Sequence, residues 1–156
     1  THWPRVTATG HSGPIDPHGA TIMLQIRDHM QPLTHSLHPG LGLAEALDRL
    51  HRANLGGLPV LDDHQHLVGF LSEQDCIPAL LTGSYHCDTR TLVEDLMSRT
   101  PLFVSPDDNI VDLARQMAGA RPKVYPVMEG GKVTGIISRR QVMQALNTQM
   151  KQCQAT

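Results

Sequence analysis

The amino-acid sequence contains the same pattern of residues twice, and this repeat constrains the fold more than any other feature. The matching positions share their residue type: Met30 and Met97, Pro39 and Pro106, Pro59 and Pro126, Gly69 and Gly135, Ser72 and Ser138. The separation is 67 residues for the first three pairs and 66 for the last two. A repeat of this length is a supersecondary unit, and two such units that pack together can close one core. A cleft between two similar halves is also a common place for a small ligand.

Each copy predicts the same order of elements. Apolar residues at helical spacing, Leu43, Leu47 and Leu50, predict an amphipathic helix, and residues 110–117 predict its counterpart. Short strands are expected at residues 35–37, 58–61 and 67–71 and at 102–104, 125–128 and 133–137, with last helices that begin at Ser72 and Ser138. The predicted fold class is therefore α+β, built from two pseudo-symmetric strand-helix-strand-strand-helix motifs.

The repeat also sets the expected domain organisation. Residues 1–22 contain three prolines and no helical or strand period, so we expect a flexible arm or an added leader. Residues 23–84 are expected to form motif 1 and residues 85–150 motif 2, together one compact domain. A connector over residues 83–91 should join them, and residues 151–156 should form a tail.

Composition excludes several classes of protein. Hydrophobic residues make up 40% of the chain and aromatic residues 3%, so the core should be aliphatic, with no aromatic platform for single-stranded nucleic acid. A net charge of −2 without a basic tail argues against a nucleic-acid partner. No apolar run approaches the ~20 residues that cross a bilayer, so no membrane segment is expected. An odd number of cysteines (Cys76, Cys87 and Cys153) favours reduced thiols and a cytoplasmic location.

Four short motifs recur in the same order in both copies. They are Asp-x-Met, a proline before an amphipathic helix, Pro-Val, and Gly-hydrophobic-hydrophobic-Ser, which continues as x-x-Asp in the first copy. In this order they resemble the cystathionine-β-synthase (CBS) domain, which occurs as tandem pairs. The resemblance covers about residues 26–147 and indicates a stand-alone pair of the bacterial type.

The resemblance implies both a fold and a function. The two motifs should pack sheet to sheet, with helices outside and two symmetry-related clefts between the halves. The family binds adenosine-containing ligands such as AMP, ADP, ATP or S-adenosylmethionine, as regulatory ligands rather than obligatory cofactors, and controls a partner protein, here unknown. Tandem pairs commonly dimerise into a flat disc, so we expect a homodimer, with the apolar face of the last helix (Val142, Ala145 and Leu146) as its surface.

The chemistry of the first copy concentrates where its last strand meets its last helix. Ser72 lies at the helix start, where its hydroxyl and free backbone N–H groups could bind a phosphate. Asp75 offers carboxylate oxygens that can accept both hydroxyls of a ribose, and the resemblance gives it this role. The same Ser-x-x-Asp spacing also fits a capping box, in which the two side chains bond backbone N–H groups at the helix start.

The second copy departs from this pattern at the equivalent turn. Ser138 is followed by Arg139, Arg140 and Gln141, so glutamine stands where the first copy has Asp75. A neutral acceptor binds more weakly than a charged one, which predicts a ribose site weaker by roughly tenfold. The two arginines, together with Lys123, could attract phosphate, and the alternative is a solvated basic surface.

The adenine ring would need apolar walls. The resemblance points to residues before the Pro-Val motif and on the first strand of a half: Leu58, Val60, Thr100, Leu102, Tyr125 and Val127. Most of them can equally be core strand residues. Thr100 is the best polar candidate, because its hydroxyl lies in a loop before a strand.

Histidine and cysteine residues raise a third possibility, a metal or redox sensor that uses His86, Cys87 and Cys76. Adjacent His86 and Cys87 cannot readily both reach one tetrahedral ion, and no Cys-x-x-Cys pair supports them. No spacing supports a catalytic triad, so the sequence predicts a protein that is not an enzyme. Three hypotheses therefore stay open: an adenosine-ligand sensor, a ligand-free interaction or dimerisation module, and a metal or redox sensor.

Overall fold

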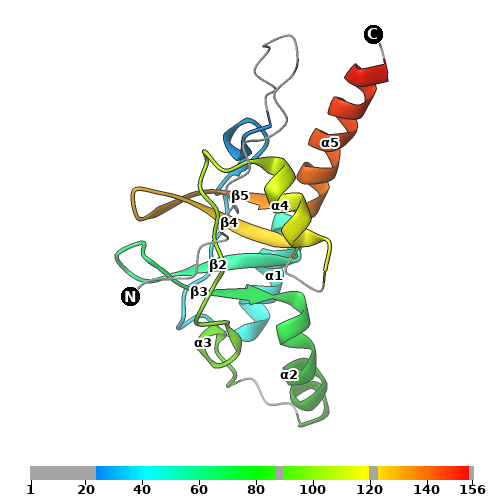
Figure 1. Cartoon of the computed structure of the whole chain (residues 1–156). Coiled ribbons are helices and arrows are strands. Elements are labelled where there is room, and N and C mark those ends of the chain that lie inside the picture. Colours follow the sequence, from blue (N-terminus) through cyan, green and yellow to red (C-terminus); the bar gives the residue numbers. More distant parts are fainter. Residues whose placement is uncertain (1–23, 87–89, 120–122, 155–156) are drawn as a thin grey trace.

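The computed structural model describes residues 24–86, 90–119 and 123–154 of the chain. The first half contains the 3-10 helix η1 (Ile26–Asp28), β1 (Gln31–Pro32), α1 (Leu43–Ala53), β2 (Gly57–Leu61), β3 (Leu67–Ser72) and α2 (Glu73–His86). The second half contains α3 (Val93–Leu96), α4 (Ile110–Met117), β4 (Val124–Glu129), β5 (Lys132–Ser138) and α5 (Arg139–Gln154). Figure 1 shows the strands in the middle of the molecule, with α2 and α3 on one side and α4 and α5 on the other.

The two amphipathic helices form where their apolar periodicity predicts them. In α1, Ala46 and Leu50 are buried, and the helix ends at Asn54, whose left-handed backbone (φ 54°) stops it. In α4, the Asn109 side chain accepts a hydrogen bond from the Val111 N–H at 2.7 Å, which caps the first turn. Each helix therefore buries one apolar face. An asparagine also marks one end of each helix: Asn54 follows α1 and Asn109 precedes α4.

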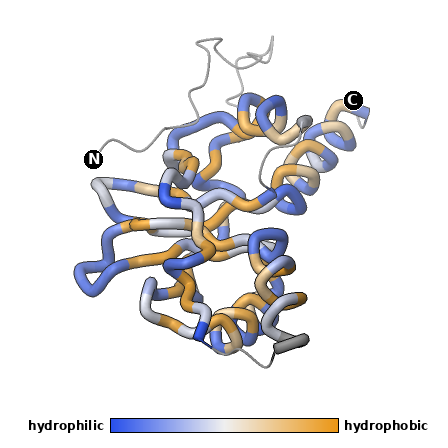
Figure 2. The backbone as a smooth tube through the Cα atoms, turned by 90° about the horizontal axis from the view of Figure 1, so that it is seen from below, coloured by the Kyte–Doolittle hydropathy of each residue, from blue (hydrophilic) through white to orange (hydrophobic). Residues whose placement is uncertain are grey.

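Each half contains one antiparallel hairpin. β2 pairs with β3 and β4 pairs with β5, and each pair carries a register shift before its turn. The β4–β5 turn contains Gly130 and Gly131 at φ 59° and 80°, a conformation that favours glycine. The expected first strands are reduced to single parallel bridges, Leu37 with Val60 and Val104 with Val127. Figure 2 shows hydrophobic segments along the central strands and hydrophilic ones at the hairpin turns.

The halves exchange short strands. β1 pairs with β5 of the second half, where Gln31 lies opposite Ile136. In the equivalent position, Ser98 of the second half pairs with Phe70 of β3, through N–H···O bonds of 2.8 and 3.0 Å. The duplication thus produces a pseudo-twofold molecule in which the start of each repeat completes the sheet of the other.

The cores are exchanged in the same way. The Ile26 N–H bonds the carbonyl of Asp108, and the equivalent Val93 N–H bonds the carbonyl of Leu41. Ile26 is buried in the cluster that contains α4 and α5, whereas Val93 is buried in the cluster that contains α1 and Cys76. Neither repeat therefore completes its own hydrophobic core.

The two sheets meet through their apolar faces. Val124 and Ile136, which belong to the second half, pack in the cluster of the first half with Leu58 and Val60. This contact confirms the predicted α+β fold with its two motifs packed sheet to sheet.

Two helices extend into segments for which the sequence predicted no helix. Helix α2 continues to His86, past the expected start of the connector at residue 83, and α5 continues to Gln154, into the expected tail. No proline or glycine interrupts α5 before that point, so nothing ends the helix earlier. Residues 1–22, the expected arm or leader, lie outside the described part of the chain.

The expected dimer surface on α5 has to be corrected. Val142 and Ala145 are buried in the core of their own half, and Leu146 packs against it. They face inward because α4 packs against α5 on this side. Among the side chains that the structure describes, the large apolar ones that are exposed are Ile77, Leu80 and Leu81 of α2 and Met143 and Met150 of α5.

Candidate functional site

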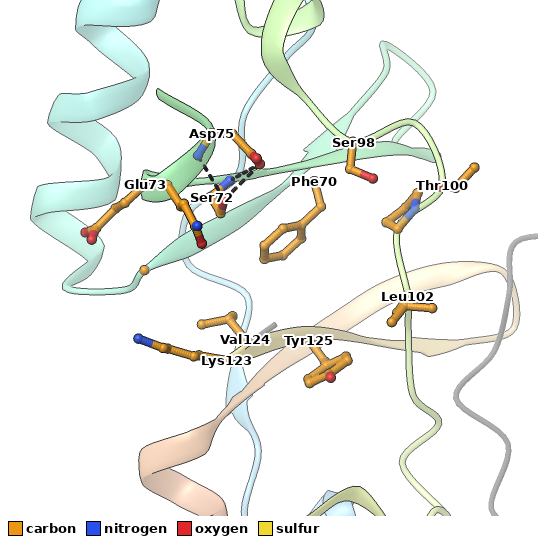
Figure 3. A pocket seen from close by; sticks show the side chains of 13 residues that line it. Phe70, Ser72, Glu73, Asp75, Ser98, Thr100, Leu102, Lys123, Val124 and Tyr125 are labelled. Carbon is orange, nitrogen blue, oxygen red and sulfur yellow. Dashed lines mark hydrogen bonds between the residues drawn. The ribbon is translucent and has the colours of Figure 1, made fainter. Parts of the chain in front are cut away.

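A cleft of about 500 Å³ opens between the two halves (Figure 3). Its lining comes from the β3–α2 turn, the segment that crosses between the halves, and the start of β4: Gly56, Phe70, Ser72, Glu73, Gln74, Asp75, Ser98, Thr100, Pro101, Leu102, Lys123, Val124 and Tyr125. Six of the residues expected at a ligand site meet in this cleft: Asp75, Ser72, Thr100, Leu102, Tyr125 and Lys123.

The Ser72–Asp75 turn forms a capping box. Oδ2 of Asp75 accepts hydrogen bonds from the Ser72 hydroxyl at 2.8 Å and the Ser72 N–H at 3.2 Å, and the Asp75 N–H donates to Oγ of Ser72 at 3.3 Å. Asp75 is nevertheless exposed and lines the cleft. Because a carboxylate can accept several hydrogen bonds, capping is compatible with accepting a further donor from a ligand.

The Thr100 segment crosses from one half to the other. Ser98 is bonded to Phe70 of β3, and six residues later the Val104 N–H bonds the carbonyl of Pro126 in β4 at 3.0 Å. The exposed Thr100 and the half-buried Leu102 lie between these two attachments and form part of the cleft lining. A ligand in the cleft would therefore touch a segment that is bonded to both halves.

The cleft also has apolar walls. Phe70 lies between the Ser72–Asp75 turn and the Thr100 segment in Figure 3, and Val124 and Tyr125 line the cleft from the start of β4. Sequence reasoning missed Phe70, Ser98 and Val124. Ser98 is the repeat equivalent of Gln31, 67 residues earlier, but only the structure shows that each of them pairs with the sheet of the other half.

The other predicted site residues do not line this cleft. Leu58 and Val60 of β2 and Val127 of β4 are fully buried. They are core strand residues, which was the alternative interpretation of these positions. Ser138, Arg139, Arg140 and Gln141 lie at the start of α5. There Gln141 Oε1 accepts from the Ser138 N–H at 2.8 Å and from its hydroxyl at 3.3 Å. This turn repeats the capping arrangement of the first half.

Cys76 does not fit a redox or metal-binding role. Its side chain is buried, and desolvation, with the nearby carboxylates of Asp75 and Glu73, raises the pKa of its thiol to about 11. The thiolate is the form that binds metals and reacts with oxidants, and it is disfavoured here. The side chain of His86 and the whole of Cys87 lie outside the described part of the chain. Among the described side chains, no group of three His, Cys, Asp or Glu residues is placed to hold a metal ion.

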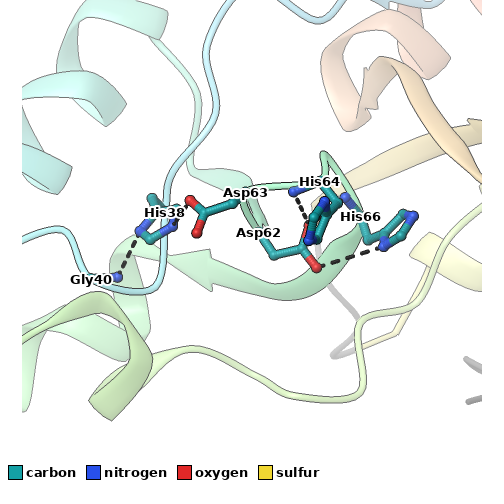
Figure 4. A network of polar contacts seen from close by, with 6 residues as sticks. All are labelled: His38, Gly40, Asp62, Asp63, His64 and His66. Carbon is teal, nitrogen blue, oxygen red and sulfur yellow. Dashed lines mark hydrogen bonds and ion pairs between the residues drawn. The ribbon is translucent and has the colours of Figure 1, made fainter.

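The histidines near the β2–β3 turn make structural contacts (Figure 4). Oδ1 of Asp62 accepts hydrogen bonds from the N–H groups of His64 and His66, both at 2.9 Å, and the His66 bond is the main cause of the lowered pKa of Asp62. Nε2 of His38 lies 2.9 Å from Oδ1 of Asp63. These contacts connect the turn to the loop that precedes α1.

Comparison with known proteins identifies the class to which this fold and cleft belong. The family model of the CBS domain matches residues 26–82 and 93–148, which are the two repeats. The chain therefore belongs to the CBS-domain family and contains a tandem CBS pair.

Individual relatives agree with this assignment. The structure of CBSX2 of Arabidopsis thaliana in complex with AMP is 32% identical, has a TM-score of 0.67, and covers 81% of this chain and 98% of that chain. The CBS-domain protein ATU1752 of Agrobacterium tumefaciens shares the fold, at 24% identity and a TM-score of 0.69 over 78% of this chain and 92% of that one. By sequence, MJ1225 of Methanocaldococcus jannaschii is 26% identical over 83% of this chain.

The chain is shorter than its full-length curated relatives. It spans 45% of the length of MJ1225 and 62% of the length of the CBSX2 sequence. Among the described residues, no helix combines the length and the apolar character needed to cross a bilayer.

Proposed function

We propose that this CBS pair is a regulatory module that binds an adenosine-containing ligand in the cleft of Figure 3. The observation that carries the proposal is the position of Asp75, which is exposed in a cleft whose apolar walls include Phe70, Val124, Tyr125 and Leu102. A carboxylate beside apolar walls can accept the ribose hydroxyls while the walls cover the base. The AMP complex of CBSX2, which is 32% identical, supports this choice of ligand.

The ligand would act through the segment that contains Thr100. This segment is bonded to β3 at Ser98 and to β4 at Val104. A ligand that contacts it can therefore bind one arrangement of the two halves more tightly than another, and so favour that arrangement. The regulated process would then be the packing of a second subunit or of a partner protein against the module.

Replacement of Asp75 by asparagine is expected to lower the affinity for AMP about tenfold, because a neutral acceptor replaces a charged one at the ribose. Asparagine keeps an oxygen that can accept the Ser72 N–H, so the melting temperature should change little. Isothermal titration calorimetry with AMP measures the effect, and Asp48→Asn, on the exposed side of α1, is the matched control. Full AMP affinity in Asp75→Asn would remove the proposed role of Asp75.

Thermal unfolding in the presence of ligand separates this proposal from a ligand-free interaction module. AMP at roughly 100 times its dissociation constant should stabilise the wild-type chain by about 2.7 kcal/mol. If adenosine, AMP, ADP, ATP and S-adenosylmethionine all leave the melting temperature unchanged, the interaction module becomes the better explanation.

We also expect the chain to form a homodimer through the outer faces of α2 and α5. Ile77 and Met143 occupy equivalent positions of these helices and are 54% and 63% exposed. A second copy presents the same two helices, so one twofold contact can cover both apolar patches. Light scattering should give a dimer for the wild type and a folded monomer for the Ile77→Glu, Met143→Glu double variant. A wild-type monomer at working concentration would contradict this expectation.

A further inference from the structure

The charged side chains around the cleft indicate a narrower class of ligand. Of the described residues that line the cleft, three are charged: the carboxylates of Glu73 and Asp75 and the ammonium group of Lys123. All three residues are exposed. Within the described part of the chain, the cleft therefore contains one positive group that can neutralise a phosphate and two negative groups that repel additional ones.

The start of α2 has little remaining capacity to bind phosphate through its backbone. The Ser72 N–H donates to Asp75, the Glu73 N–H donates to the carbonyl of Gly56 at 2.9 Å, and the Asp75 N–H donates to Ser72. Three of the four N–H groups at residues 72–75 thus already have partners within the chain. A phosphate would have to compete with these bonds, whereas helix starts that bind phosphate present free N–H groups to it.

The second half shows that the fold tolerates the opposite charge at the same positions. Arg139 and Arg140 of α5 are equivalent to Glu73 and Gln74 of α2, 66 residues apart. The Arg139 N–H bonds the carbonyl of Lys123 at 2.8 Å, as the Glu73 N–H bonds Gly56, so the two helix starts have the same backbone arrangement. Neither arginine lines the cleft. The same backbone arrangement therefore accepts either acidic or basic side chains. The negative charge of this cleft comes from the particular residues, Glu73 and Asp75, that this chain has there.

We propose that this cleft selects an adenosine derivative with at most one phosphate group, and that Glu73 is the residue that discriminates against di- and triphosphates. This inference rests on the proposed function, because it assumes that the ribose binds at Asp75. The 5′ substituent of such a ligand lies near Glu73 and Lys123, which in Figure 3 extend to the same side, away from Thr100 and Leu102. Lys123 pairs with the first phosphate, and Glu73 repels any phosphate beyond it.

Calorimetry of the full chain with adenosine, AMP, ADP and ATP, in buffer without divalent cations, tests this inference. Wild-type protein should bind AMP at least about tenfold more tightly than ATP, and added salt should reduce the difference by screening. Glu73→Arg, which introduces the residue found at the equivalent position of α5, should raise ATP affinity about tenfold and change adenosine affinity less than about twofold. Glu129→Arg is the matched control, because Glu129 is exposed at the far end of β4 and does not line the cleft.

Three results would overturn the inference, wholly or in part, in distinguishable ways. Equal affinities of the wild type for AMP and ATP would overturn the selectivity alone and leave the proposed function intact. The absence of binding by all four compounds would overturn the proposed function and the selectivity together. If Glu73→Arg and Glu129→Arg alter the ATP affinity equally, Glu73 is not the discriminating residue. Thermal unfolding of each variant confirms that it is folded.

Discussion

Alanine at Gly69 is expected to lower the free energy of unfolding by about 2–3 kcal/mol, a large effect for one methyl group. A Cβ atom at this position would lie 2.8 Å from the carbonyl oxygen of Ser98 and would also press on the side chain of Met97. Ser98 is the residue that the second half pairs with β3. The Ser98 contact is a backbone atom, so a side-chain rotation cannot relieve it, and the exchanged segment has to move away.

Urea denaturation measures this effect, and Gly119→Ala is the matched control. A Cβ atom at Gly119 would meet nothing within 4 Å, so alanine there should change stability by less than about 1 kcal/mol. Gly135→Ala should resemble Gly69→Ala, since its Cβ would lie 2.6 Å from the carbonyl oxygen of Gln31 on the opposite exchanged strand. If Gly69→Ala and Gly119→Ala unfold at the same urea concentration, Ser98 does not pack against β3 in the way described.

Truncation of Ile26 to alanine should cost about 2–5 kcal/mol, the range for a large aliphatic residue removed from a core. Ile26 is fully buried in a cluster whose buried residues, apart from Leu24 and Ile26 itself, belong to the second half. Ile26 belongs to motif 1 in the sequence, but it packs in the core of motif 2. The substitution should therefore destabilise motif 2 more than motif 1.

Hydrogen exchange distinguishes the two assignments. In Ile26→Ala, the amides of α4 and α5 should lose more protection than those of α1, because Ile26 packs in the cluster of α4 and α5. Val93→Ala gives the reciprocal control, with greater loss expected in α1, because Val93 packs in the other cluster. Greater loss in α1 for Ile26→Ala would contradict the exchanged cores.

Six of the predicted site residues line one cleft, but the sequence could not separate them from the predicted residues that do not. Ser72 and Asp75 were found because their spacing is local, within one turn of helix. Leu58 and Val127 looked equally plausible beside Tyr125, and they proved to be core residues. The choice depends on which side of each strand faces the other half, and short apolar strands buried on both faces carry no alternation that reveals it.

The amino-acid sequence by itself determined the duplication, the order of the longer helices and hairpins, and the turn that carries Asp75, because each of these depends on spacing between nearby residues or on their recurrence. Only the tertiary structure decided that Ile26 and Val93 exchange cores, that Ser98 pairs with Phe70, and that Arg139 and Arg140 stay outside the cleft. These features depend on contacts between residues far apart in the chain. Such contacts leave no periodic pattern within either repeat, because the two residues meet only after the halves have packed together.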